Sequence, residues 1–298
     1  MGKEKVIKSK KVKNNRAFNV INIILLILLT LIIVLPVWNI VVSSFEGGSN
    51  VVNDGIKLWP EKFSLDNYKA VFKDTTIWKA FGVSVLKTVI GVVTHVLFTA
   101  MVAYGMSKSY LAGRKLYSVL GIMTMFLSGG MIPTYLLVKS LGLLNSFWVF
   151  IIPALFSYYD MIIIMNFFRE VPVSLEESAQ IEGAGVWQIF FRIILPLSKP
   201  VLCTIALFNG VYQWNDYMTT KLYITDKALY PVQMKLYEVI VQQQSQTAQN
   251  LTNVVTTQTT TRSIQLATIV IATVPILLAY PLLQKHLMSG MVIGAVKE

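Results

Sequence analysis

The sequence is poor in cysteine and in charge. Its single cysteine, Cys203, cannot form an intrachain disulfide, which excludes a disulfide scaffold. Charged residues make up 14% of the chain, well below the about 25% of an ordinary soluble domain. The hydrophobic share is high at 54%, whereas intrinsic disorder needs low hydrophobicity with high net charge. Together these features favour a membrane protein over a soluble or disordered one.

The chain also lacks the groups that catalysis and cofactor binding require. Its only histidines are His95 and His286, and no third ligand stands at a metal-binding spacing, so we expect no metal site. No phosphate-cradling G-x-x-x-x-G-K-[ST] pattern occurs, so a separate protein would have to bind ATP. The acidic residues cluster in one loop without a nucleophile and base, which argues against a membrane enzyme such as a lipid-linked sugar transferase. We therefore expect neither a cofactor nor a catalytic residue in this chain.

Six mainly apolar stretches approach the about 20 residues that a helix needs to cross roughly 30 Å of hydrocarbon. They run over Phe18–Phe45, Ala80–Met106, Leu116–Leu141, Phe147–Phe168, Pro196–Tyr217 and Ile264–Leu283. Glycine or proline interrupts several of them, and such breaks are tolerated where neighbouring helices or a water-filled cavity satisfy the backbone. Ordinary helix kinks are the alternative. The predicted fold class is all-α, a polytopic membrane protein with six transmembrane helices.

Lysine and arginine are concentrated on one side of these spans. Seven cations and one acid precede the first span, and the second-to-third connection carries Lys108, Arg114 and Lys115 without an acid. Because positive charge is retained on the cytoplasmic side, both termini are predicted to be cytoplasmic. Residues 1–17 would form a basic cytoplasmic segment, residues 18–285 the transmembrane domain and residues 286–298 a cytoplasmic tail.

The basic start of the chain resembles the start of a secretory signal. The apolar core that follows is longer than the usual about 7–15 residues of such a signal, so we predict a retained first span. The net charge of +11 is explained by topology and by contact with anionic membrane lipid. A nucleic-acid partner is not needed to account for it.

Two connections are predicted on the outer face. Ser64 can cap a short amphipathic helix in which Leu65, Tyr68 and Phe72 recur at helical spacing. The long connection over residues 219–262 ends in a tract rich in glutamine and threonine. That composition cannot build a core, so we expect a flexible solvated loop, or one that a partner orders.

The cytoplasmic connection over about residues 170–195 is more elaborate than a closing turn requires. Ser174 and Glu177 have the spacing of a capping box, which predicts a helix that begins near Leu175. A hairpin that merely closes two spans is the alternative.

Two glycines divide this connection. Gly183 and Gly185 allow a sharp change of direction. Residues 186–194 can then form a second short helix before Pro196 opens the fifth span. The sequence thus predicts a helix-turn-helix on the cytoplasmic side.

The same connection resembles the EAA loop of ABC-importer permeases, which reads Glu-Ala-Ala, then Gly, then Ile-x-Leu-Pro. Here Glu177 and Ala179 match, Ser178 replaces one small residue with another, and Glu182 stands where an aspartate is usual. In that family the loop forms coupling helices that sit in a groove of the ATP-hydrolysing subunit and transmit its closure to the membrane helices. The resemblance implies a coupling role for Glu177, Ser178, Ala179, Glu182, Gly183, Ala184, Gly185, Leu195 and Pro196.

Further segments resemble the carbohydrate branch of these permeases, similar to the smaller maltose permease chain and to complex-oligosaccharide permeases. They are Phe126–Tyr135, Trp214–Asp216 and Tyr280–Lys297. The resemblance implies a protein of the bacterial cytoplasmic membrane that imports an oligosaccharide or complex glycan. It also implies three partners: a second homologous permease, a dimer of ATP-hydrolysing subunits that binds ATP and Mg, and an extracytoplasmic solute-binding protein. Importers of oligopeptides or polyamines share the EAA loop and a membrane sensor could use it, so both stay open as alternatives.

Polar side chains in the predicted fifth span suggest a solute pathway. Asn209, Gln213 and Asp216 are spaced by four and three residues and share one helical face. Polar groups at membrane depth usually face a bundle interior or a cavity, and hydrogen bonds between helices are the alternative. The candidate pathway residues are Asn209, Tyr212, Gln213, Trp214, Asn215 and Asp216. Lys87, within the second span, would snorkel to a surface or pair with Asp160 or Asp216.

Overall fold

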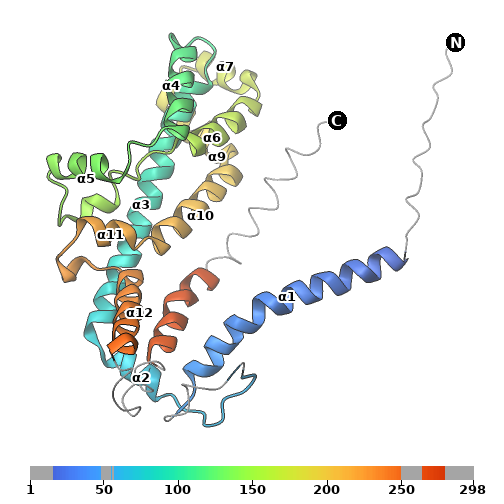
Figure 1. The fold of residues 1–298 in the computed structure, drawn as a ribbon. Helices are drawn as coiled ribbons and strands as arrows, with labels where there is room; N and C mark the ends of the chain where they lie inside the picture. The colour runs from blue at the N-terminus through green and yellow to red at the C-terminus, as the bar shows by residue number, and fades with distance from the viewer. Residues whose placement is uncertain (1–15, 48–54, 56, 250–263, 279–298) are drawn as a thin grey trace. The chain divides into compact units, whose positions relative to one another are not determined.

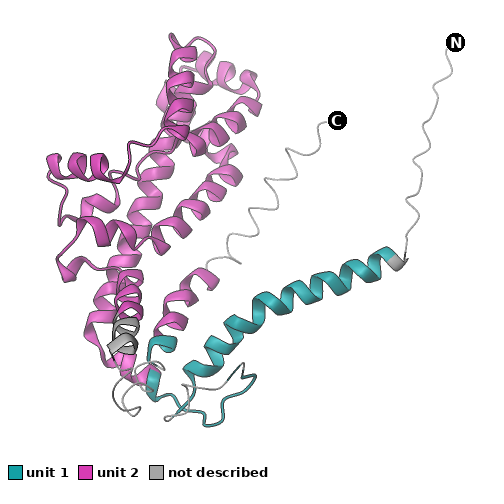
Figure 2. Ribbon diagram, viewed as in Figure 1, with its two compact units in different colours: residues 1–67, 255–267 teal, residues 68–254, 268–298 magenta. Residues whose placement is uncertain are grey.

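The computed structural model describes residues 16–47, 55, 57–249 and 264–278. The described residues form helices, and apart from an isolated bridge between Glu46 and Phe63 they contain no β-structure (Figure 1). The predicted all-α class is confirmed. The chain divides into two compact units, residues 1–67 with 255–267 and residues 68–254 with 268–298 (Figure 2).

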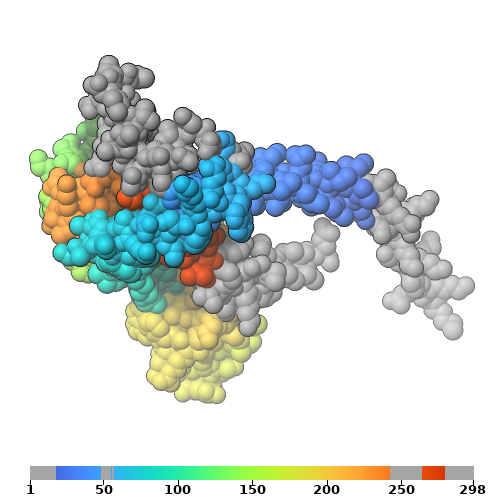
Figure 3. All heavy atoms as spheres, turned by 90° about the horizontal axis from the view of Figure 1, so that it is seen from below, coloured from blue at the N-terminus to red at the C-terminus, as the bar shows by residue number. Residues whose placement is uncertain are grey.

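Unit 1 is dominated by one long apolar helix, α1 (Arg16–Ser44). Its apolar window from Phe18 onward is not buried at all within the chain, and its side chains lie open on the face seen in Figure 3. A helix that is hydrophobic all round requires lipid or other protein around it. This is the first predicted span, and it begins and ends within two residues of the expected limits.

After α1 the chain folds back on a buried carboxylate. Glu46 accepts hydrogen bonds from the backbone N–H groups of Glu61 at 3.0 Å and Lys62 at 3.1 Å. Asn67 donates from Nδ2 to the carbonyl oxygens of Ser44 and Glu46. These bonds precede the short helix α2 (Asp66–Lys73), where Ser64 Oγ accepts from the Asp66 N–H at 3.0 Å. The predicted short helix is confirmed.

Unit 2 is built around α3 (Thr75–Ser107), which packs along α10 (Lys199–Asn215) and α6 (Tyr158–Glu170) (Figure 1). Small residues let the helices approach closely, as expected for membrane helices: Ala100 and Ala103 of α3 are fully buried against Ile164 and Ile205. The second predicted span is therefore confirmed as a helix, extended by five residues at its start.

The third and fourth predicted spans are not continuous helices. In place of 116–141 the structure has α4 (Arg114–Phe126) and α5 (Met131–Ser140), which meet at 116°. The break falls at Gly130, whose φ of +84° suits glycine alone. In place of 147–168 a short 3-10 turn (Phe147–Phe150) and irregular chain around Pro153 precede α6, because proline interrupts the helical hydrogen bonds.

The fifth predicted span begins later than expected. Pro196 lies in α9 (Leu195–Leu197), which belongs to the preceding helical segment 186–197, and this segment meets α10 at 80°. The turn falls at Ser198, and Pro200 occupies the first turn of α10, where its missing N–H has no helical partner to lose. The prediction that Pro196 opens the span is therefore wrong.

Two helices of the described part, Phe18–Ser44 and Thr75–Ser107, are each long and apolar enough to cross a membrane, and the two bent pairs also pass if each is one span. The helix of the sixth prediction covers Ile264–Leu278. Residues 279–283 of that prediction, the tail 286–298 and residues 1–15 lie outside the described residues.

The connection expected to be a flexible loop is helical over its first part. It contains α11 (Met218–Tyr223), a 3-10 turn (Lys227–Leu229) and α12 (Val232–Gln249). Two side chains hold it: Asn145 Oδ1 accepts from the Thr225 N–H at 2.6 Å, and Ser84 Oγ accepts from the Val232 N–H at 2.8 Å. These anchors lie far away in the sequence, so composition alone misses them. Residues 250–262 lie outside the described part.

Candidate functional site

The predicted helix-turn-helix consists of α7 (Val173–Ile181), α8 (Val186–Ile189) and a π-helical turn (Phe190–Ile194) that runs into α9. The capping box does not form: α7 begins at Val173 after Pro172, and no side chain caps it. Ser174 therefore lies inside the first turn instead of ahead of it. Proline at this position fixes the entry to the helix without a side-chain cap.

The turn between the two helices is a tightly hydrogen-bonded glycine corner. The Gly183 N–H donates to the Gln180 carbonyl at 3.0 Å, and the Ala184 N–H donates to the Ala179 carbonyl at 2.9 Å. This pattern is the Schellman motif, in which the residue after the helix adopts a left-handed conformation. Gly183 has the required φ of +85°. The Gly185 N–H then donates to Gln188 Oε1 at 3.0 Å and starts α8.

The coupling-motif residues divide between a packed and an exposed face. Ala179, Ala184 and Leu195 pack against the core of unit 2, whereas Glu177, Ser178, Glu182 and Pro196 are exposed. Large apolar side chains are exposed beside them, with Ile181 at 87%. The exposed apolar side chains of this element are those of Val173, Leu175, Ile181, Val186, Trp187 and Phe191. An apolar patch on a projecting element marks an interaction surface.

A polar contact joins this element to the end of α3. Glu176 of α7 forms an ion pair with Lys108, which follows α3, and accepts a hydrogen bond from the Tyr104 hydroxyl at 3.3 Å. Lys108 Nζ also lies 4.1 Å from the centre of the Tyr104 ring. Sequence reasoning concentrated on the neighbouring Glu177 and missed Glu176. The signal was the uncompensated positive charge of the Lys108 connection.

Four of the six candidate pathway residues are engaged within the protein. Gln213 Nε2 donates to the Phe150 carbonyl at 3.2 Å and Trp214 Nε1 to the Ala272 carbonyl at 3.0 Å. Asn215 Nδ2 donates to the Val211 carbonyl one turn earlier. For these residues the structure favours the alternative of hydrogen bonding within and between helices.

Asp216 is the fourth of them, and it settles the partner of Lys87. The Lys87 ammonium donates to the Asp216 carbonyl at 2.7 Å and lies 3.5 Å from its Oδ2. Its side chain is completely buried and lies 4.7 Å from the centre of the Phe150 ring. A lysine buried at this depth needs such a partner, so this pair connects α3 to the end of α10.

The two remaining candidates, Asn209 and Tyr212, line a cavity of about 380 Å³ between α3, α6 and α10. His95 and Asp160 face the same cavity and contact each other, with Nε2 and Oδ2 2.9 Å apart. The other ring nitrogen of His95, Nδ1, lies 2.8 Å from the Ala154 carbonyl. Sequence reasoning considered His95 as hydrogen-bonded structure, which these contacts agree with, but did not place it beside Asn209.

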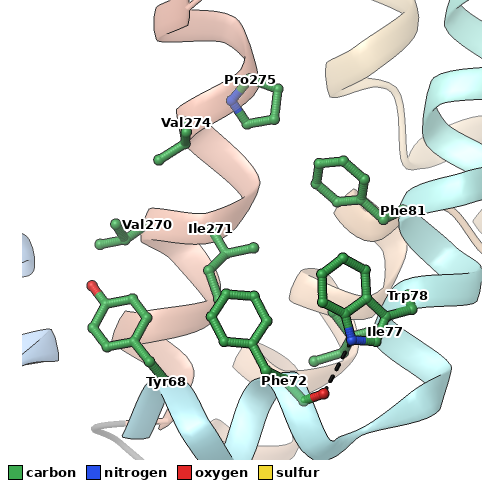
Figure 4. Close-up of a pocket in the computed structure, with 9 residues that line it drawn as sticks. All are labelled: Tyr68, Phe72, Ile77, Trp78, Phe81, Val270, Ile271, Val274 and Pro275. Atoms are coloured by element: carbon green, nitrogen blue, oxygen red, sulfur yellow. Dashed lines mark hydrogen bonds between the residues drawn. The ribbon is translucent and has the colours of Figure 1, made fainter. Parts of the chain in front are cut away.

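A second cavity of unit 2 has a different character. It lies between α2, the start of α3 and the helix 264–278, and is apolar on all sides (Figure 4). The indole N–H of Trp78 is already used, donating to the Phe72 carbonyl at 3.0 Å (Figure 4). The lining residues are Tyr68, Phe72, Ile77, Trp78, Phe81, Val270, Ile271, Val274 and Pro275. Such a cleft suits hydrocarbon and offers little to a polar solute.

Residues 96–292 match the family described as the binding-protein-dependent transport system inner membrane component. The chain belongs to this family. It is therefore a membrane permease subunit of a transport system, and this family is not one of enzymes. The match covers α6, the helix-turn-helix and α10, which are the elements of the candidate site.

Individual relatives extend the similarity to nearly the whole chain. Over 285 residues the chain is 44% identical to protein LplC of Bacillus subtilis (strain 168), with 96% of each covered. It is 41% identical over 283 residues to the polygalacturonan/rhamnogalacturonan transport system permease protein YtcP of the same organism, covering 95% of this chain and 99% of that protein.

The fold agrees with a solved transporter. A chain in the crystal structure of a bacterial ABC transporter involved in the import of the acidic polysaccharide alginate is similar with a TM-score of 0.83 and 28% identity. The similarity covers 93% of this chain and 99% of that one. A second structure, a bacterial alginate ABC transporter in complex with alginate pentasaccharide-bound periplasmic protein, is similar at a TM-score of 0.57 and 15% identity, which concerns the fold alone.

Proposed function

We propose that this chain is the permease subunit of an ATP-driven importer that translocates an oligosaccharide or complex glycan. An extracytoplasmic binding protein delivers the sugar. Support for the sugar comes from the relatives, whose names or titles concern pectic polysaccharides and alginate. Those names make a sugar a better candidate than an oligopeptide or polyamine, although the coupling motif is shared among all three.

The observation that carries the proposal is the apolar, glycine-cornered helix-turn-helix. Its turn is fixed by two backbone hydrogen bonds, and its exposed face carries Ile181, Val186 and Trp187. Such a rigid apolar projection is suited to a groove of a separate ATP-hydrolysing subunit, which holds ATP and Mg. Exposure on this scale would be unfavourable without a partner protein.

The coupling element is tied to the transmembrane helices at two places. Ala179 and Ala184 pack against the core of unit 2, and Glu176 pairs with Lys108 at the end of α3. Movement of the ATP-hydrolysing partner would therefore rotate α3 together with the helix-turn-helix. Rocking of a bundle around a central site is the alternating-access mechanism of transporters.

The proposed topology has six spans with both termini cytoplasmic. Within the described part, α1 and α3 count as one span each and the two bent helix pairs as two more. The basic residues of 1–17 and of the α3–α4 connection would lie on the cytoplasmic side, with the transmembrane domain over 18–285. The open apolar surface of α1 then faces lipid and a second, homologous permease.

The test is to express the tagged chain with its neighbouring transport genes, extract it gently and identify what co-purifies. The purified assembly is then placed in liposomes with the binding protein, and ATP-dependent uptake of a labelled oligosaccharide is measured. Recovery of an ATP-hydrolysing subunit and a second permease, with uptake that needs ATP, supports the proposal. A stable homomer without an ATP-hydrolysing subunit contradicts it.

A further inference from the structure

The cavity between α3, α6 and α10 contains a polar cluster that coupling to ATP hydrolysis does not use. Three of its members are His95, Asp160 and Asn209, one from each helix. Polar groups at membrane depth are rare and usually serve a cavity or a partner. The three helices thus bring together side chains that are 49 to 114 positions apart along the chain, since 209 minus 160 is 49 and 209 minus 95 is 114.

The His95–Asp160 pair carries no net charge. Both ring nitrogens of His95 face acceptors, the Ala154 carbonyl at 2.8 Å and Asp160 Oδ2 at 2.9 Å. Nδ1 must donate to the carbonyl, so one further proton lies between Nε2 and the carboxylate. Whichever atom holds that proton, the pair is neutral overall. Only Oδ2 contacts His95, which leaves Asp160 Oδ1 as an acceptor toward the cavity.

Asn209 is buried without a hydrogen-bond partner. Its side chain is 7% exposed, and its Oδ1 has no donor among the described residues. A buried amide oxygen normally accepts a hydrogen bond, since leaving it unpaired is costly. Tyr212, one turn nearer the end of α10, lines the same cavity and is 59% exposed. An unpaired amide beside an open aromatic ring is the combination that a pyranose ring with its hydroxyls fits.

We propose that this cavity binds neighbouring hydroxyl groups of the transported sugar through Asn209 and Asp160, with the sugar ring against Tyr212. The inference rests on the proposed import function. The cavity volume of about 380 Å³ lies within the about 300–1,000 Å³ of small-molecule sites. Among the described lining residues the neutral His95–Asp160 pair supplies the one possible cation, so hydroxyl groups are recognised here and an acidic sugar's carboxylate is not.

The test measures retention of a labelled trisaccharide by the purified assembly held with a non-hydrolysable ATP analogue. The probes are a galacturonate trisaccharide and its methyl ester, which keeps the ring hydroxyls that are free and removes the charge. Asn209→Ala should weaken retention of both probes about tenfold, the loss of one good hydrogen bond with a buried group. Tyr212→Ala should weaken it a few fold, about the loss of one ring contact.

The matched control is Thr204→Ala on the same helix, because its hydroxyl bonds to the Pro200 carbonyl within α10 and does not line the cavity. It should leave retention unchanged. If Asn209→Ala fails to assemble, the near-isosteric Asn209→Asp carries the test. Its added negative charge should weaken retention of the acid more than that of the ester, and equal retention of the two would overturn the inference.

Three further outcomes separate the possibilities. If the unaltered assembly neither retains nor imports either sugar, the sugar assignment fails and this inference with it. If it imports sugar but Asn209→Ala retains it normally, or loses only the acid, the hydroxyl site alone is wrong. If Asn209→Ala reduces pairing of the two permeases without changing retention per assembled complex, a side chain of the partner permease fills the cavity and the inference is overturned.

Discussion

Lys108, just beyond the end of α3, and Glu176, in the first half of the coupling helix α7, form an ion pair that joins two segments 68 positions apart. Both side chains are largely buried, at 16% and 13% exposure. Partial burial makes such a pair stronger and less sensitive to salt than a surface pair. The pair is therefore well placed to pass movement from the helix-turn-helix to the longest helix of unit 2.

Glu176→Gln should reduce sugar uptake several fold while ATP hydrolysis continues, because the amide keeps the shape but loses the charge that holds Lys108. Uptake per ATP hydrolysed in liposomes is the measurement. A matched control is Glu238→Gln, whose partner Lys235 lies one turn earlier on the same helix. The exchange Lys108→Glu with Glu176→Lys should restore part of the coupling, and uptake that stays normal in Glu176→Gln alone would show that the contact is passive.

Gly183→Val should leave the chain in the membrane but uncouple it. The backbone at Gly183 has a φ of +85°, which costs an L-residue about 1–2 kcal/mol and a β-branched one more. The turn would open and misplace α8 relative to α7. The quantity to compare is sugar-stimulated ATP hydrolysis, which should fall close to its unstimulated level.

Gly142→Val supplies the control for backbone strain alone. Gly142 has a φ of +68°, a Cβ there would meet nothing within 4 Å, and the position lies after α5, outside the helix-turn-helix. It should lower stability by a similar amount and keep stimulation. Equal loss of stimulation in the two variants would mean that general instability explains both.

The long helices were predictable from sequence, and their breaks only in part. Runs of aliphatic residues without glycine or proline set the limits of α1 within two residues. Gly130 and Pro153 announced interruptions but not the 116° angle between α4 and α5, since that angle depends on what each half packs against. Tyr158 of α6, which bonds from its hydroxyl to the Ser118 carbonyl, is one such contact.

The pathway residues show a similar limit. Helical spacing correctly placed Asn209 and Gln213 on one face, yet the first faces a cavity and the second bonds to the carbonyl of Phe150, 63 positions earlier. Spacing describes a single helix, whereas the environment of each side chain is set by its neighbours. The neighbour of Gln213 comes from the irregular chain around Phe150, which sequence reasoning expected to be a helix.

Gly121→Ala should destabilise unit 2. A Cβ at Gly121 would lie 1.9 Å from the ring of Tyr158, so α4 and α6 would have to separate. Overpacking of this kind typically costs about 1–3 kcal/mol. The midpoint of thermal unfolding in detergent should fall by several degrees. Gly82→Ala is the control, because a Cβ there meets nothing within 4 Å; an equal fall in both variants would contradict the packing argument.

Lys87→Met should be the most destabilising of these changes. It removes the completely buried ammonium and leaves the Asp216 carboxylate, 11% exposed, without its partner. Breaking one side of a buried ion pair costs about 3–5 kcal/mol, whereas replacing both sides by neutral groups can be nearly harmless. Lys87→Met combined with Asp216→Asn should therefore recover much of the lost thermal stability and yield. Lys235→Met, in a more exposed pair with Glu238, should change stability little. If the double variant is as unstable as Lys87→Met alone, the ammonium acts through its bond to the Asp216 backbone carbonyl at 2.7 Å and through the Phe150 ring, and the carboxylate is dispensable.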